Sequence, residues 1–206
     1  MEIAKFVVVA AIAYLLGNIQ TGLLIGRLTN NVDLRQHGSG SSGATNALRV
    51  LGRKSALFTL LGDALKGIIA TLVGMAIAGW HGGLVAALFV IIGHIWPVFY
   101  GFHGGKGVAA SIGSLAVVMP LQALLMVVIG VAVLLWSKMV SLASITGAFV
   151  FMIAGSITGI VNQDWLQVAV SLLMGIIVIF AHRTNIKRLK NGTENKISAK
   201  MIKSKK

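Results

Sequence analysis

Long runs of apolar residues, separated by short polar or glycine-rich segments, restrict what this chain can fold into. Of its 206 residues, 56% are hydrophobic and only 11% are charged, whereas a soluble domain carries about 25% charged residues. Most runs approach the roughly 20 residues that an α-helix needs to cross a bilayer. The sequence therefore predicts an all-α, polytopic integral membrane protein with about seven transmembrane helices. The expected spans are residues 3–25, 55–78, 84–100, 108–118, 121–136, 139–161 and 165–181. The fourth is short, and the alternative for it is a tilted, partly buried helix.

The distribution of basic residues predicts the orientation of these spans. With seven helices and the N-terminus outside, every lysine and arginine except Lys5 and Lys66 belongs to the cytoplasmic loops or the tail, as the positive-inside rule requires. The net charge of +13 then indicates anionic lipid at the basic tail rather than nucleic acid. We expect an external N-terminus and a cytoplasmic C-terminus. The absence of cysteine excludes thiolate catalysis.

The first polar stretch, residues 38–49, reads GSGSSGATNALR. Its glycines let the backbone approach a ligand closely, and its hydroxyls, N–H groups and Arg49 together suit an anion cradle. A flexible linker is the alternative interpretation. The spacing also matches the dinucleotide fingerprint GxGxxG, but that motif requires a preceding strand and a βαβ unit. The flanking segments here are membrane-type apolar runs.

A second stretch, residues 93–107, reads GHIWPVFYGFHGGKG. Lys106 lies among glycines, where an ammonium and nearby N–H groups can hold one phosphate. It is not a P-loop, because Tyr100 and Gly107 occupy positions that this motif reserves for glycine and for serine or threonine. A snorkelling interfacial lysine is the alternative. No cysteine or carboxylate stands at metal-ligand spacing from His94 or His103, so we expect no metal.

The third stretch opens the tail at residues 182–194, HRTNIKRLKNGTE. His182 and Asn185 share a face if the helix continues, although a plain polybasic segment is the alternative. All three stretches belong to the expected cytoplasmic side and can therefore form one site. Within the second span, Asp63 and Lys66 are expected to form a structural ion pair.

The three stretches together resemble the PlsY family of bacterial membrane acyltransferases. The family pattern GSGNxGATNxxR is matched by residues 38–49, GHxxPxF…GGKGVA by residues 93–109, and HRxNIxRL…GTE by residues 182–194. Two positions depart from the pattern, with Ser41 in place of asparagine and Ala110 in place of threonine. The resemblance covers the whole length, so we expect one membrane-embedded domain at 1–190 and a basic cytoplasmic tail at 191–206.

The resemblance implies transfer of a fatty acyl group from acyl-phosphate to the 1-hydroxyl of sn-glycerol 3-phosphate, giving lysophosphatidate and phosphate in phospholipid biosynthesis. It implies no cofactor, and an active site at the cytoplasmic face of the bacterial cell (inner) membrane. The residues expected to be catalytic are Ser39, Arg49, Lys106, His182 and Asn185. Those expected to bind substrate or phosphate are Gly38, Gly40, Ser41, Gly43, Thr45, Asn46, Gly104, Gly105, Gly107, Arg183 and Glu194.

The expected chemistry relies on positioning, because an acyl-phosphate is already activated. Arg49 and Lys106 are expected to neutralise phosphate, and N–H groups near Ser39 and at residues 104–107 to hold phosphate or the oxyanion. His182 is either a base or a positioning residue, and we favour positioning. The alternative function is a transporter or flippase of a phosphorylated solute or lipid, although the sequence shows no repeated halves. A scaffold that binds anionic lipid leaves the first two stretches unexplained.

Overall fold

The structure is a computed structural model that describes residues 2–197, and within this range all regular structure is helical. The α-helices are α1 (Glu2–Gly17), α2 (Thr21–Asn30), α3 (Ala44–Val50), α4 (Arg53–Ile95), α5 (Val108–Val118), α6 (Pro120–Ser137), α7 (Val140–Val161), α8 (Trp165–Ala181) and α9 (Arg183–Lys190). Two short 3-10 helices, η1 (Leu34–Gln36) and η2 (Val98–Tyr100), lie in the connecting loops.

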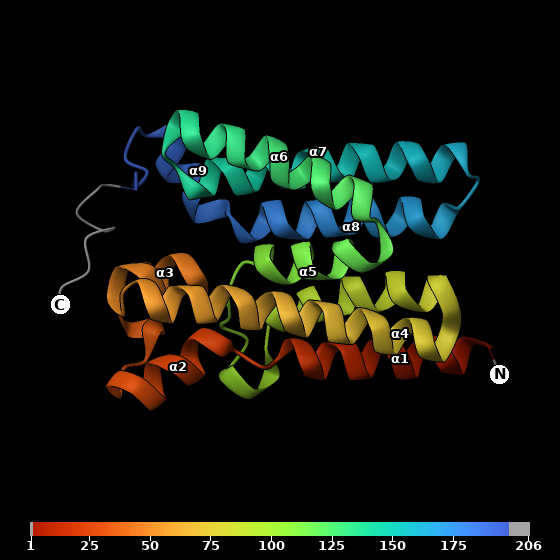
Figure 1. Cartoon of the computed structure of the whole chain (residues 1–206), viewed down its shortest axis with the longest axis horizontal. Coiled ribbons are helices and arrows are strands. Elements are labelled where there is room, and N and C mark those ends of the chain that lie inside the picture. Colours follow the sequence, from red (N-terminus) through yellow and green to blue (C-terminus); the bar gives the residue numbers. More distant parts are fainter. Residues whose placement is uncertain (1, 198–206) are drawn as a thin grey trace.

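The long helices form two layers with α5 between them (Figure 1). One layer holds α1, α2, α3 and α4, and the other holds α6, α7 and α8. Helix α5 contacts both α4 and α6, and α8 also reaches α4. The core is apolar, with Leu84, Ile91, Leu115 and Met174 each at most 1% exposed. The layers are therefore joined by one continuous apolar core.

Helix α4 is not one straight helix, because the polypeptide reverses direction within it. Ala78 and Gly79 have non-helical backbone angles, and Gly79 has φ of 63°, a conformation that glycine adopts without steric cost. A Cβ atom on Gly74 would lie 2.5 Å from the Gly82 carbonyl oxygen, whereas eight residues of straight helix rise about 12 Å. Residues 53–77 and 80–95 are thus two antiparallel arms, as Figure 1 shows. The predicted spans 55–78 and 84–100 place this turn slightly later in the sequence.

The first predicted span is broken where polar residues interrupt it. Helix α1 ends at Gly17 and α2 begins at Thr21. Between them the buried side chain of Asn18 donates to the Tyr14 carbonyl oxygen at 2.7 Å, and Gln20 is also buried. Polar groups that are buried require partners, and here the broken backbone and the side chains supply them to each other. The unwound segment lies beside the candidate site.

Four helical segments among residues 2–197 are long and apolar enough to cross a membrane, namely residues 3–30, 53–100, 120–137 and 140–161. There are five if α8 and α9, bent by 59° relative to each other, are counted as one broken span. The segment at 53–100 contains both arms of α4. Exposed apolar side chains such as Leu121, Leu135 and Trp136 cover the outer surface, as expected for helices that face lipid. The chain is therefore a helical membrane bundle, and the count of seven crossings stays a prediction.

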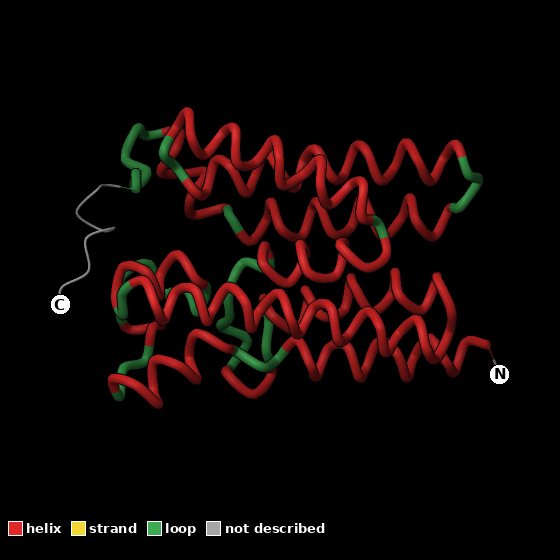
Figure 2. Tube along the Cα trace, in the orientation of Figure 1, coloured by secondary structure: helices red, strands yellow, loops and turns green. Residues whose placement is uncertain are grey.

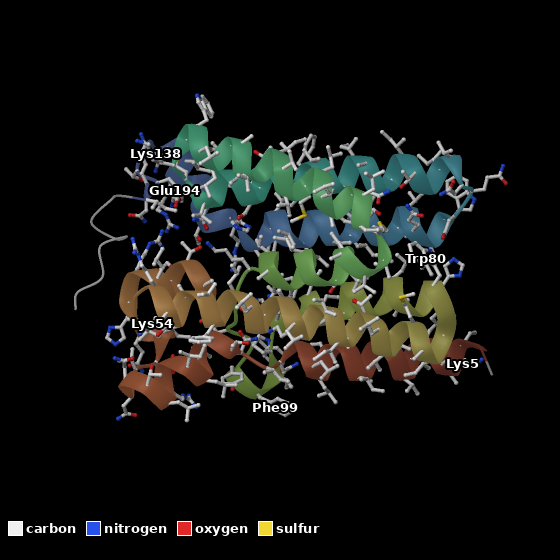
Figure 3. All side chains as sticks on the ribbon, in the orientation of Figure 1. Lys5, Lys54, Trp80, Phe99, Lys138 and Glu194 are labelled. Atoms are coloured by element: carbon white, nitrogen blue, oxygen red, sulfur yellow. The ribbon has the colours of Figure 1, made fainter. Side chains whose placement is uncertain are left out.

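The two ends of the bundle differ in character. Most of the loop residues gather toward one end (Figure 2), and Lys54, Lys138 and Glu194 lie at that end, whereas Lys5 and Trp80 lie at the other (Figure 3). At the Trp80 end, His81 Nε2 lies 3.1 Å from Asp164 Oδ2 and links the two layers. The described termini also lie at opposite ends (Figure 1). Most of the predicted tail, residues 198–206, lies outside the described residues.

Candidate active site

A cavity of about 150 Å³ lies where the three polar stretches meet. We call it the polar cavity. We use loop 1 for residues 38–49, which include the first part of α3, and loop 2 for residues 101–107. Both loops contribute to its wall, together with the starts of α5, α7 and α9. The predicted site residues that line it are Ser39, Ser41, Gly43, Thr45, Asn46, Arg49, Lys106, Gly107, His182, Asn185 and Glu194.

Asn46 holds loop 1 in shape from within. Its Nδ2 atom donates to the carbonyl oxygens of Leu34, His37 and Ser41 at 2.8–3.0 Å, and its Oδ1 atom accepts from the Ser39 N–H at 2.8 Å. The side chain is only 1% exposed. Although Asn46 lines the cavity, its amide is used by the loop itself. The Ser39 N–H that we expected to hold an anion is likewise already occupied.

Loop 2 packs directly on His94. A Cβ atom on Gly104 would lie 2.0 Å from the His94 carbonyl oxygen, and one on Gly105 would lie 2.1 Å from His94 Nε2. The N–H groups of both glycines are also used, since they donate to the carbonyl oxygens of Ile95 and His94. These glycines therefore serve close packing in this structure. Gly107, with φ of 80°, begins α5 and turns the N-terminus of that helix toward the cavity.

The third stretch is folded back on itself rather than forming a free tail. Asn185 Nδ2 donates to both carboxylate oxygens of Glu194 at 3.1 and 3.2 Å, and Arg188 Nε donates to the same carboxylate at 3.0 Å. Burial acts to raise the pKa of Glu194, but the hydrogen bonds from Arg188 and Asn185 outweigh it and leave that pKa lowered. Beyond this stretch, the Ile197 N–H donates to the Lys138 carbonyl oxygen at 2.8 Å.

His182 follows directly after helix α8 and is only 2% exposed. Its Nδ1 atom lies 2.8 Å from the Val178 carbonyl oxygen, and because a carbonyl only accepts, Nδ1 carries a proton. Burial, followed by the charge of Lys106, lowers the pKa of His182 to about 4. The ring is therefore neutral at pH 7 and a weak base.

The cavity carries positive charge that is poorly solvated. Burial, followed by the charge of Arg188, lowers the pKa of Lys106 to about 8, so this lysine is still mostly protonated at pH 7. The Nε atom of Arg49 is buried and has no hydrogen-bond partner among the described residues. A buried donor without a partner is costly, and an anionic ligand in the cavity would supply one.

An apolar groove of about 440 Å³ adjoins the polar cavity. The two share wall residues from α3, α4, α5 and α7, including Thr45, Leu60, Val108 and Ser144. Beyond them the groove runs between α5, α6 and α7 past Ile112, Met126, Val127, Gly130 and Gly147. A polar head and an apolar chain of one molecule can thus lie in adjoining spaces.

Some of the expected site residues lie away from the cavity, and others were missed. Gly38, Gly40, Gly104, Gly105 and Arg183 are not part of its wall, and the Arg183 guanidinium instead lies 4.8 Å from the centre of the Phe180 ring. The polar wall residues that sequence reasoning missed are Asp63, His94, Ser141, Ser144 and Asn195.

Two of the missed residues left a signal in the sequence. Ser141 and Ser144 are three residues apart at the start of a predicted span, next to Lys138, so they share a helix face near the basic side. Polar residues inside a membrane helix usually face the protein interior or a water-filled cavity.

Comparisons with known proteins agree with this geometry. The family model described as glycerol-3-phosphate acyltransferase matches residues 7–192. This chain belongs to that family. A glycerol-3-phosphate acyltransferase of Thermoanaerobacter sp. (strain X514) is 45% identical over 94% of this chain and 96% of its own. The enzyme of that name from Clostridioides difficile (strain 630) is 42% identical over 97% and 99%.

Solved structures of the family have the same fold. The crystal structure of PlsY, an integral membrane glycerol 3-phosphate acyltransferase, in its glycerol 3-phosphate form has a TM-score of 0.88 and 35% identity, and covers 96% of this chain and 98% of that one. Its lysophosphatidic acid form has a TM-score of 0.82 and 34% identity. This chain is therefore an acyltransferase of the glycerol-3-phosphate acyltransferase family.

Proposed function

We propose that this chain transfers a fatty acyl group from acyl-phosphate to the 1-hydroxyl of sn-glycerol 3-phosphate, giving lysophosphatidate and inorganic phosphate. The observation that carries the proposal is the junction of a cationic cavity with an apolar groove, which share Thr45, Leu60 and Val108. The acyl chain would lie in the groove, and the phosphates of both substrates in the polar cavity. The relatives' names support glycerol 3-phosphate as the acceptor.

Three features of the cavity suit phosphate. Arg49 offers a planar fork that matches phosphate oxygens, and its buried Nε–H lacks a partner among the described residues. Lys106 offers a second charge. The first N–H groups of α5, at Val108 and Ala109, lie at a helix N-terminus, where anions are favoured. We assign anion binding to these groups rather than to the N–H groups of Ser39, Gly104 and Gly105.

In the proposed reaction the 1-hydroxyl oxygen attacks the acyl carbonyl carbon. The new ester bond forms as the bond between that carbon and the bridging phosphate oxygen breaks, and phosphate leaves. The hydroxyl proton passes to a phosphate oxygen, because the neutral His182 ring is too weak a base at pH 7. The Arg49 and Lys106 charges stabilise the oxyanion and the departing phosphate. His182 and Asn185 position substrate and the Lys106 ammonium.

We place the polar cavity at the cytoplasmic face of the bacterial cell membrane. The end of the bundle that carries Lys54 and Lys138 is rich in basic residues, which favours the cytoplasmic side and contact with anionic lipid. The two arms of α4 and the short helix α5 would complete seven crossings, with the N-terminus outside. A cytoplasmic site would receive both water-soluble glycerol 3-phosphate and a lipid-like donor.

The decisive experiment uses purified protein in detergent or vesicles with glycerol 3-phosphate and three alternative donors. We expect lysophosphatidate and phosphate with acyl-phosphate, and no product with acyl-CoA or acyl carrier protein. The polar cavity, at about 150 Å³, has a size and charge suited to phosphate groups. Robust turnover with acyl-CoA alone would contradict the proposed donor.

A further inference from the structure

One backbone carbonyl connects the two loops that form the polar cavity. The His94 carbonyl oxygen accepts from Gln20 Nε2 at 3.1 Å and from the Gly105 N–H at 3.1 Å. Gln20 Oε1 in turn accepts from the Ser42 hydroxyl at 2.6 Å. A continuous chain of hydrogen bonds therefore runs from Ser42 in loop 1, through Gln20 and His94, to Gly105 in loop 2.

The histidine at the centre of this chain is held by a buried lysine. Lys66 Nζ lies 2.6 Å from His94 Nδ1 and donates to the Gly17 carbonyl oxygen at 3.0 Å, and it forms an ion pair with Asp63 Oδ1 at 3.1 Å. Lys66 is 4% exposed and Asp63 is 2% exposed. The ion pair and these hydrogen bonds restrict the movement of the buried ammonium and of the groups around it. Lys66 therefore joins the C-terminal end of α1 to the His94 ring.

Of the residues in this hydrogen-bond chain, only His94 lines the polar cavity. Gln20, Ser42 and Gly105 are not wall residues, whereas Ser41, next to Ser42, and Lys106, next to Gly105, are. Gln20 is fully buried, and Ser42 is 1% exposed. A change at Gln20 would therefore act on the cavity indirectly, through the positions of the two loops and of His94.

We propose that Gln20 is a positioning residue that sets the separation of loops 1 and 2, and with it the distance between Arg49 and Lys106 across the cavity. The inference rests on the proposed function for its effect on turnover. Reactions that depend on the alignment of two bound substrates are sensitive to displacements of about 1 Å, which can lower the rate about 100-fold. Gln20 thus affects acyl transfer although it touches neither substrate.

The test compares two buried glutamines that each bridge structural elements. Gln20→Leu and Ser42→Ala each break the chain of hydrogen bonds that joins loop 1 to loop 2. Gln167→Leu is the matched control, because Gln167 is 4% exposed and donates to the Gly155 carbonyl oxygen and to Thr158 Oγ1, but does not line the cavity. We expect Gln20→Leu to lower kcat/KM for glycerol 3-phosphate about tenfold or more, while Gln167→Leu lowers Tm but leaves kcat/KM near the parent value.

A double-mutant cycle then separates positioning from general loss of packing. Ser42→Ala alone should lower kcat/KM, but in the Gln20→Leu background it should have little further effect, because its partner is already absent. The proposal would be overturned if the fold-losses in kcat/KM of Gln20→Leu and Ser42→Ala multiply in the double variant. It would also be overturned if Gln20→Leu is no less active than Gln167→Leu.

Hydrogen–deuterium exchange provides a readout that does not depend on turnover. We expect faster exchange at residues 101–107 in Gln20→Leu and Ser42→Ala, since the Gly105 N–H would lose the support of the chain, and unchanged exchange there in Gln167→Leu. Unchanged exchange at residues 101–107 in both site variants would overturn the inference. Absence of turnover in the parent protein would instead overturn the proposed function, and the exchange result would still decide the inference.

Discussion

Lys106 donates a hydrogen bond to Asn185 Oδ1, and this contact joins two segments that are 79 residues apart in the chain. Asn185 in turn donates to the Glu194 carboxylate, so the ammonium is positioned through a neutral amide rather than by direct pairing with the acid. Its positive charge thus remains available to a ligand. Burial of this ammonium lowers the pKa of Lys106 to about 8. Its charge is therefore sensitive to moderately alkaline pH.

Activity should therefore fall above pH 8. A lysine whose pKa is lowered from 10.5 to about 8 loses its charge as the pH rises through 8, and phosphate binding weakens with it. Because kcat/KM reports the ionisation of the free enzyme, its alkaline limb should lie near pH 8 and move upward in Lys106→Arg. If the alkaline limb of kcat/KM stays at the same pH in Lys106→Arg, the limb reports the ionisation of another group.

Arg49 should contribute through its shape as well as its charge. We expect Arg49→Ala to lower kcat/KM about ten- to a hundredfold, since a hydrogen bond to a charged group is worth about 1.5–3 kcal/mol. Arg49→Lys should remain clearly impaired, because an ammonium lacks the planar fork. The exposed Arg53, which does not line the cavity, supplies the control Arg53→Ala. Near-parent rates in both Arg49 variants would exclude its phosphate role.

The acidic limb of the pH profile should not come from His182. With a pKa of about 4, His182 stays neutral throughout the range where a phosphate with a second pKa near 6 titrates. We expect His182→Gln to keep an acidic limb near pH 6 while lowering the maximal rate. If the variant loses this limb with unchanged acceptor binding, His182 is the base.

Gly130 in α6 should influence which acyl chains fit the groove. It lines the groove, and a Cβ atom there would meet only the Ala143 carbonyl oxygen, at 3.4 Å. A larger side chain can therefore fill the groove without backbone strain. We expect Gly130→Phe to lose turnover with long-chain acyl-phosphates but to retain it with short ones. Val128→Phe, at a position that is 55% exposed on the same helix, should keep the parent profile. Equal losses at all chain lengths would reject the groove assignment.

The proposed orientation can be measured by labelling, because the chain contains no cysteine. We expect a membrane-impermeant thiol reagent to label Asn162→Cys in intact cells. Lys54→Cys and Lys190→Cys should react only after the membrane is opened. All three positions are exposed, so differences in labelling would reflect the side of the membrane. Labelling of Lys190→Cys from outside intact cells would contradict the proposed topology.

Several features could be predicted because they depend on local properties. Apolar runs of bilayer length allow only helices or closed barrels, so an all-helical bundle followed directly from composition. The ion pair between Asp63 and Lys66 followed from helical spacing and is confirmed at 3.1 Å. The three motifs identified most of the polar cavity wall, and Arg49, Lys106 and His182 all line it.

Other features depend on contacts between distant segments, which local patterns do not encode. Gly104 and Gly105 were expected to approach phosphate, but in the folded chain they approach His94, because loop 2 closes onto the end of α4. Asn46 was expected to bind substrate, but the curvature of loop 1 turns its amide onto three carbonyl oxygens.

Hydropathy and charge thus determined that the chain is a membrane helix bundle with polar motifs in reach of one another, since both are sums over neighbouring residues. Tertiary packing alone decided which side-chain and backbone atoms form hydrogen bonds between distant segments. Gln20 and Gly105 share the His94 carbonyl only because α1 breaks and α4 reverses at Gly79. A buried polar group must find its partner wherever the fold places one, and that place follows from three-dimensional packing rather than from position along the chain.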